Sequence, residues 1–121
     1  MILDNTQLTD VCKDIAQGNR SGVTLRYTEN GFRIFSPSYG YAYSSIRGNK
    51  QIPTQEFSIV SLYDMDVHNE DLLGIWLNEQ DNTVSMTFSN YTEDESEARQ
   101  YCIKTQQIGY YSFSQGKTVY L

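Results

Sequence analysis

The chain has 121 residues, the length of a single domain that can bury a sizeable core, and its 39% hydrophobic and 20% charged residues exclude a disordered chain. Its formal charge of −6 and pI near 4.6 oppose attraction to nucleic acid or anionic membranes, because phosphate binding depends on Lys and Arg. No apolar run approaches the roughly 20 residues that span a bilayer, and residues 1–4 lack the basic start of a secretory signal. We therefore expect a cytoplasmic protein that does not enter the membrane.

The first predicted element is a helix over approximately residues 6–17. Its apolar side chains recur at intervals of three and four residues, which places them on one face: Leu8, Val11, Cys12, Ile15 and Ala16. Asn5 or Thr6 is the expected N-cap, and Gly18 is the expected end of the helix.

A β-hairpin is predicted next, because apolar and polar residues alternate over residues 23–28 and are followed by Asn30-Gly31. This dipeptide favours a type I′ turn, which needs positive φ at both central positions. If the dipeptide forms the turn, Tyr27 pairs with Ile34, and the apolar side chains of both strands share one face.

Three tyrosines then alternate with small residues, at positions 39, 41 and 43. One interpretation is a surface on which a base, a sugar or a peptide stacks on Tyr39, Tyr41 and Tyr43, with Arg33 or Arg47 binding an anionic group. The other is structural: the rings close one edge of the core and keep their hydroxyls at the rim. The sequence leaves both interpretations open.

The middle of the chain should continue as strands and loops. Residues 47–50 are expected to form a basic turn, and residues 57–63, apolar on both faces, a central strand. An acidic loop over residues 64–71 follows. Residues 72–77 and 84–88 then read as a second hairpin around a polar turn, although a short helix over residues 69–76 is an alternative.

The last part of the chain combines a helix and a third hairpin. Thr92 and Glu95 form a capping-box pattern that opens a helix over approximately residues 92–107, and Gly109 is expected to stop it. Strands are predicted over residues 110–114 and 118–121. The fold class is therefore α+β: a single, mostly antiparallel sheet of about six to eight strands with both helices packed on one face.

Two cysteines, Cys12 and Cys102, each lie on the apolar stripe of a predicted helix. The simplest interpretation is a pair of small buried residues, and a disulfide between the two helices is the alternative.

No catalytic or cofactor motif is present, so we predict a protein that is not an enzyme and needs no cofactor. If residues 64–70 are extended, one face of the strand carries Asp64, Asp66, His68 and Glu70. Three carboxylates and an imidazole in this arrangement could hold a divalent cation. The EF-hand pattern nevertheless fails, because Ile75 stands where the bidentate glutamate is required. We interpret the segment as a solvated acidic loop and predict no metal site.

Residues 56–97 contain eleven Asp and Glu and not one Lys or Arg. The leading hypothesis is that this acidity binds a basic protein partner, as in a nucleic-acid mimic such as a phage inhibitor of host defence, or in an immunity protein paired with a toxin. The predicted acidic face comprises Asp64, Asp66, Glu70, Asp71, Glu79 and Asp81.

Three other roles remain open from the sequence. A small ligand or nucleotide would bind the Tyr/Arg surface described above. A structural subunit would expose an apolar patch around Trp76. The edge strand at residues 118–121 also offers a route to a homodimer.

Overall fold

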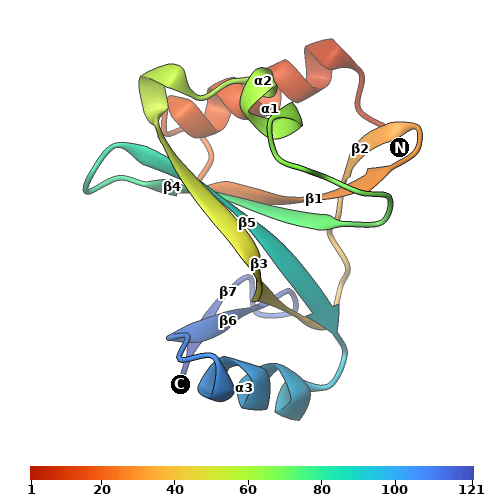
Figure 1. Cartoon of the computed structure of the whole chain (residues 1–121), viewed down its shortest axis with the longest axis vertical. Helices are drawn as coiled ribbons and strands as arrows, with labels where there is room; N and C mark the ends of the chain where they lie inside the picture. Colours follow the sequence, from red (N-terminus) through yellow and green to blue (C-terminus); the bar gives the residue numbers. More distant parts are fainter. The chain divides into compact units, whose positions relative to one another are not determined.

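The computed structural model describes residues 1–121. The fold comprises one antiparallel sheet of seven strands, two longer helices and two short ones (Figure 1). The elements, in chain order, are α1 (Asn5–Ala16), β1 (Gly22–Thr28), β2 (Gly31–Ile34), β3 (Tyr41–Pro53), the 3₁₀ helix η1 (Thr54–Glu56), α2 (Ile59–Tyr63), β4 (Leu72–Asn78), β5 (Thr83–Thr92), α3 (Glu95–Lys104), β6 (Gly109–Ser112) and β7 (Lys117–Tyr120).

The predicted fold class, α+β with a single sheet, is confirmed, and the strand order is β2-β1-β4-β5-β3-β6-β7. Both predicted helices are present, as α1 and α3. Their packing on one face of the sheet stays a prediction. None of the helices combines the length and the apolar character that crossing a membrane requires.

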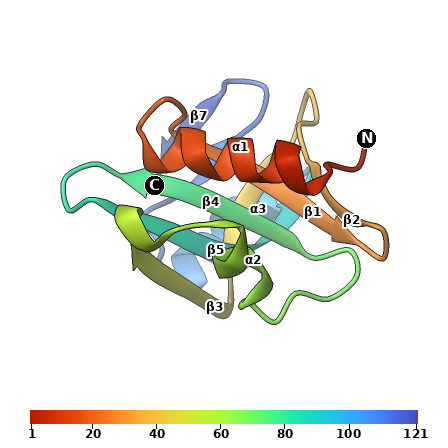
Figure 2. The same cartoon turned by 90° about the horizontal axis from the view of Figure 1, so that it is seen from above.

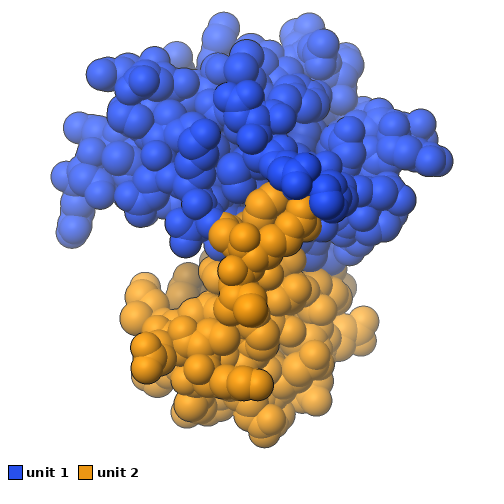
Figure 3. Space-filling model, viewed as in Figure 1, with its two compact units in different colours: residues 1–35, 49–87 blue, residues 36–48, 88–121 orange.

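The chain divides into two compact units (Figure 3). Unit 1 comprises Met1–Phe35 and Asn49–Thr87, and unit 2 comprises Ser36–Gly48 and Phe88–Leu121. Each unit has its own buried core. The most deeply buried side chains of unit 1 are Leu8, Ile15, Leu25, Phe32, Leu62, Leu73, Ile75, Val84 and Met86. The core of unit 2 consists of Tyr41, Tyr43, Ala98, Cys102 and Tyr110.

Helix α1 lies against β1 and β4 in unit 1 (Figures 1 and 2). Its N-cap is Asp4, one residue before the two predicted candidates. The Asp4 carboxylate accepts from the Gln7 N–H (2.8 Å) and the Gln7 side chain accepts from the Asp4 N–H (2.9 Å), so two otherwise unpaired amides are satisfied. Gly18 follows the helix with φ +81°, which supports its predicted role as the end.

The β1–β2 hairpin has the predicted strands but not the predicted register. Tyr27 lies opposite Phe32 and Thr28 opposite Gly31, so the turn is Glu29-Asn30. The Thr28 hydroxyl donates to the Gly31 carbonyl (3.0 Å) and so bridges the two ends of this turn. The partner of Tyr27 is thus shifted by two residues relative to the prediction. Because side chains alternate between faces with a period of two, the same side chains still share one face.

Residues 47–63 differ most from the prediction. The expected basic turn at residues 47–50 is part of the long strand β3, and the expected strand at residues 57–63 contains helix α2. Ser58 caps this helix: its hydroxyl accepts from the Val60 N–H (3.3 Å), while the Ser61 hydroxyl accepts from the Ser58 N–H (3.1 Å). The helix buries Leu62 and leaves Val60 61% exposed, so its apolar residues do not fill two faces.

The β4–β5 hairpin is confirmed, and the alternative helix over residues 69–76 is wrong. Helix α3 is shorter than predicted at both ends. Thr92 belongs to β5, and its hydroxyl donates to the Glu97 carboxylate (2.7 Å). Asp94 is the N-cap, because its carboxylate accepts from the Ser96 N–H (3.0 Å). At the other end Gln106, with φ +60°, interrupts the helix before Gly109.

Both cysteines are buried free thiols, as the simpler interpretation predicted. Cys12 belongs to unit 1 and Cys102 to unit 2. Burial disfavours the thiolate, and it raises the pKa of Cys12 to about 11 and also raises the pKa of Cys102.

We expect both thiols to resist a thiol-specific reagent in the native protein at neutral pH, because only the thiolate reacts and its population is small. Titration in denaturant without reductant should reveal two thiols. A native protein that reacts at once, or a denatured protein with no free thiol, would contradict the buried, unlinked pair.

Candidate functional site

The two units differ in charge. Unit 1 contains eleven Asp and Glu against five Lys and Arg, whereas unit 2 contains four of each. The formal charge of −6 therefore belongs entirely to unit 1. Within it, residues 49–87 contribute seven carboxylates and a single cation, Lys50.

Three carboxylates of the acidic loop that precedes β4, those of Asp66, Glu70 and Asp71, make contacts within the chain. Asp71 accepts from the His68 N–H (2.6 Å), and Asp66 lies 3.2 Å from Nε2 of the same histidine. These contacts close the loop on itself. No group of three or more His, Cys, Asp or Glu side chains in the structure is placed to hold a metal ion.

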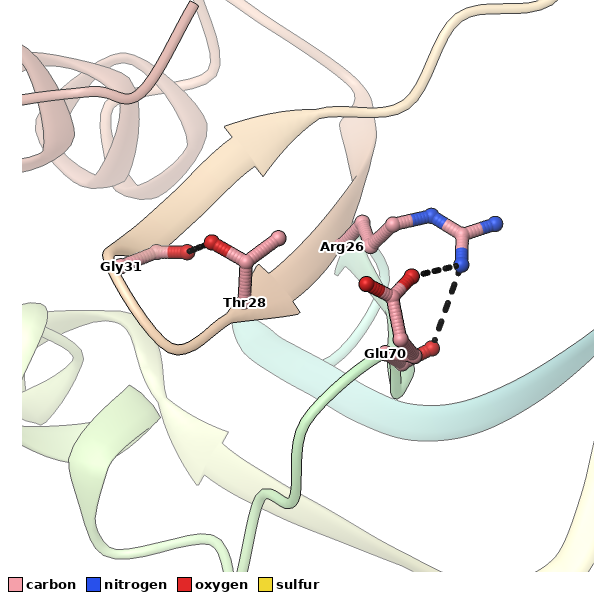
Figure 4. Close-up of polar contacts among 4 residues, drawn as sticks. All are labelled: Arg26, Thr28, Gly31 and Glu70. Atoms are coloured by element: carbon pink, nitrogen blue, oxygen red, sulfur yellow. Dashed lines mark hydrogen bonds and ion pairs between the residues drawn. The ribbon is translucent and has the colours of Figure 1, made fainter.

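Glu70 ties the loop to β1 (Figure 4). Its carboxylate lies 2.8 Å from a terminal nitrogen of Arg26, and its N–H donates to the Tyr27 carbonyl (2.7 Å). Glu70 has φ +72°, an unfavourable conformation for a side chain with Cβ, which these contacts maintain. Because 60% of the Glu70 side chain is exposed, we assign the ion pair no more than about 1 kcal/mol of stabilisation.

Arg26 itself is held from two sides. Its guanidinium lies over the Phe35 ring, 4.8 Å from the centroid, in addition to its contact with Glu70. Its Nε is buried without a hydrogen-bond partner. The predicted acidic face thus includes one carboxylate, Glu70, that already has a cationic partner.

Glu79 and Asp81 lie in the β4–β5 turn, at the end of β4 opposite the acidic loop (Figure 2). The seven residues of β4 correspond to about 20 Å of extended chain. Asp81 accepts from the Thr83 hydroxyl (2.8 Å), and Asn82 completes the turn with φ +54°. The six predicted residues therefore do not form one cluster.

The structure brings a different set of carboxylates together. The Thr54 N–H donates to the Asn82 carbonyl (2.9 Å), so η1, which contains Glu56, lies beside the β4–β5 turn. Glu56 and Asp64 both line a shallow depression of about 350 Å³, which Lys50 lines as well.

Glu56, Asp64, Glu79 and Asp81 are all exposed and belong to unit 1, and we call them the acidic band. The carboxylates of three of them, Glu56, Asp64 and Glu79, make no ion pair or hydrogen bond within the chain. Sequence reasoning missed Glu56, because only the contact between Thr54 and Asn82 places it beside the turn.

The tyrosines of the predicted ligand surface lie in unit 2 with different exposures. Tyr39 is 49% exposed, whereas Tyr41 and Tyr43 are buried. The Tyr41 ring meets Tyr110 edge-on at 5.6 Å, and the Tyr43 ring lies 4.9 Å from Tyr101. Two of the three rings thus occupy the core, as in the structural interpretation.

The hydroxyls of Tyr41 and of its neighbour Tyr110 take part in hydrogen bonds. A hydrogen bond with Tyr39, followed by desolvation and the charge of Glu95, raises the pKa of Tyr41 to about 12. The Tyr110 hydroxyl donates to the Glu95 carboxylate (2.8 Å). Burial, ahead of this hydrogen bond, raises the pKa of Tyr110.

The two arginines of the predicted ligand surface belong to different units. Arg47 lies in unit 2 and stacks on the Phe88 ring, 4.0 Å from its centroid. Arg33 lies in unit 1 and lines a shallow depression of about 410 Å³ together with Glu29 and Glu70.

Trp76 is half-buried and lies across Gly22 of the neighbouring strand, where a Cβ would overlap the indole ring. Comparisons of the chain with protein-family models, with curated proteins and with solved structures find no match.

Proposed function

We propose that the protein is a non-enzymatic inhibitor that binds a basic protein partner stoichiometrically through the acidic band of unit 1. One observation carries the proposal: the whole net charge belongs to unit 1, where the band exposes the carboxylates of Glu56, Asp64 and Glu79 without partners within the chain. Such carboxylates can pair with Lys or Arg of another protein without first breaking an existing contact.

The band differs in this respect from the rest of the acidic loop, residues 65–71. Asp66, Glu70 and Asp71 already make contacts within the chain, so binding through them would first cost those contacts. Complementary charge mainly speeds association and orients the partner. A nucleic-acid-binding or nuclease surface is the kind of basic partner that fits, as expected of an anti-defence or immunity protein.

The small-ligand alternative has weaker support, because the rings of Tyr41 and Tyr43 are buried in the core of unit 2.

The proposal is tested by neutralising the band in one variant, Glu56→Gln, Asp64→Asn, Glu79→Gln and Asp81→Asn. The matched control neutralises four other exposed carboxylates, Asp10→Asn, Asp14→Asn, Glu29→Gln and Glu93→Gln, so both variants have the same net charge. A labelled oligo-arginine peptide is the probe, and fluorescence anisotropy at low and high salt is the measurement.

We expect the band variant to bind the peptide about tenfold more weakly than the control, at about 0.3–0.5 kcal/mol for each exposed ion pair. Salt should weaken binding by the wild type more than by the band variant. If the two variants lose affinity equally, binding follows net charge alone and the band is not the site. Pull-down from the natural host at low and high salt, with the band variant as the comparison, then identifies the partner.

A further inference from the structure

The two edges of the sheet are protected differently. At the edge formed by β2, the N–H of Leu3 donates to the Phe32 carbonyl (2.9 Å), so the segment before α1 covers part of that edge. At the other edge, β7 pairs only with β6. It contains neither proline nor a bulge, and Lys117 is its single charge. Proline, bulges and charged side chains are the features by which edge strands usually avoid pairing with other chains, and β7 has only one of them, Lys117.

The ladder between β6 and β7 shows which backbone groups of β7 are unpaired. The N–H of Leu121 donates to the Ile108 carbonyl (3.0 Å), in the register that places Gly109 opposite Tyr120. Hydrogen-bonded positions alternate along an antiparallel strand, so Val119 also directs its N–H and C=O toward β6. Thr118 and Tyr120 therefore direct theirs toward the free edge.

We propose that β7 pairs antiparallel with β7 of a second copy of this chain, with Thr118 of each copy opposite Tyr120 of the other. This register forms two hydrogen-bonded pairs, each exchanging two bonds, and it uses every outward group of the strand. It also places a β-branched residue opposite an aromatic one, a favourable cross-strand pair.

Charge and exposure favour a second copy over a foreign strand. Unit 2, which contains β7, has equal numbers of acidic and basic residues, so its own net charge does not oppose the pairing of two copies. In the proposed register the two Lys117 residues stand four positions apart, about 13 Å along the strand. Exposed apolar side chains at the edge would be covered: Tyr120 is 68% exposed and Leu121 44%.

A contact of four residues a side is small, so the dimer should be weak and dependent on concentration. Sedimentation velocity across micromolar concentrations tests it in the full chain. The variant Thr118→Pro removes an outward N–H without removing a bond to β6, and Thr118→Val keeps that N–H as the matched control. Circular dichroism verifies that both variants fold.

We expect the wild type and Thr118→Val to approach twice the 13.9 kDa monomer mass as concentration rises, and Thr118→Pro to remain at 13.9 kDa. In a second measurement, Val119→Cys should form an interchain disulfide, because directly opposed residues that do not exchange hydrogen bonds lie about 4.5 Å apart between Cα atoms. Salt should not weaken the dimer, whereas it weakens binding to a basic partner, so the two proposals fail independently.

Three results would overturn the inference: a wild type that stays monomeric, a dimer that persists in Thr118→Pro, or a Val119→Cys protein without an interchain disulfide. A monomer whose β7 captures an extended peptide would assign the edge to a foreign strand instead.

Discussion

Replacing Phe32 by alanine is expected to lower the free energy of unfolding by about 3–5 kcal/mol. Phe32 is 1% exposed in the core of unit 1. Its ring meets Tyr27 edge-on at 4.9 Å and lies 5.6 Å from the ring of Tyr63. Alanine removes these contacts and leaves a cavity that the surrounding strands and α2 cannot fill without moving. Denaturant unfolding followed by the fluorescence of Trp76, the single tryptophan and a residue of unit 1, measures the loss.

Ile34→Ala is the matched control, because Ile34 lies two residues further along β2 and is 38% exposed. We expect it to cost about 1 kcal/mol or less, as for a partly exposed site. If Phe32→Ala and Ile34→Ala destabilise the protein equally, Phe32 is not a core residue and the packing described for unit 1 is wrong.

The second large effect is expected from Gly40→Ala in unit 2. Gly40 has φ +103°, a conformation that costs a residue with Cβ about 1–2 kcal/mol. Its Cβ would also overlap the Tyr91 side chain, whose hydroxyl donates to the Tyr39 carbonyl (2.6 Å). Overpacking of this kind adds about 1–3 kcal/mol, so we expect a total of about 3 kcal/mol. Thermal unfolding followed by circular dichroism measures it.

Gly116→Ala separates the two causes. Gly116 has φ +66° in the β6–β7 turn, and no atom lies within 4 Å of an added Cβ. The control therefore includes the backbone cost without the overlap, and it should destabilise the protein by about 1–2 kcal/mol. Equal losses for Gly40→Ala and Gly116→Ala would show that the contact between Gly40 and Tyr91 does not constrain unit 2.

Local sequence patterns predicted the elements that local contacts determine. The apolar stripe of α1, the alternation in β1 and β5, and the third hairpin all appear where the periodicity placed them. The predicted register of the first hairpin was wrong because it relied on Asn30-Gly31, a dipeptide that is frequent in turns but does not fix the position of this one. The Thr28 hydroxyl donates to the Gly31 carbonyl and favours a turn at Glu29-Asn30.

The segment from Ser58 to Tyr63 shows where periodicity fails. Apolar residues at positions 57, 59, 60, 62 and 63 suggest a strand buried on both faces. The pair Ser58 and Ser61 forms a reciprocal cap instead, which a count of apolar residues does not detect. The resulting helix exposes Val60 and Tyr63, which a central strand would bury.

The candidate site was predictable only in its chemistry. An excess of carboxylates between residues 56 and 97 is evident from the sequence, whereas their grouping is a tertiary property. Strand β4 separates Glu70 and Asp71 from Glu79 and Asp81, and the contact between Thr54 and Asn82 places Glu56 beside the turn. The tyrosines could not be assigned from sequence either, since one alternating pattern serves a core and a binding surface equally well.

The most direct test of the acidic band is a titration of ¹⁵N-labelled protein with an oligo-arginine peptide, followed by amide chemical shifts. We predict that the largest changes occur at residues 54–56, at Asp64 and at residues 78–82. The acidic start of α3, residues 93–97, should change little, although it has four carboxylates in five residues. Changes that are largest at residues 93–97, or that spread evenly over all exposed carboxylates, would contradict the proposed binding surface.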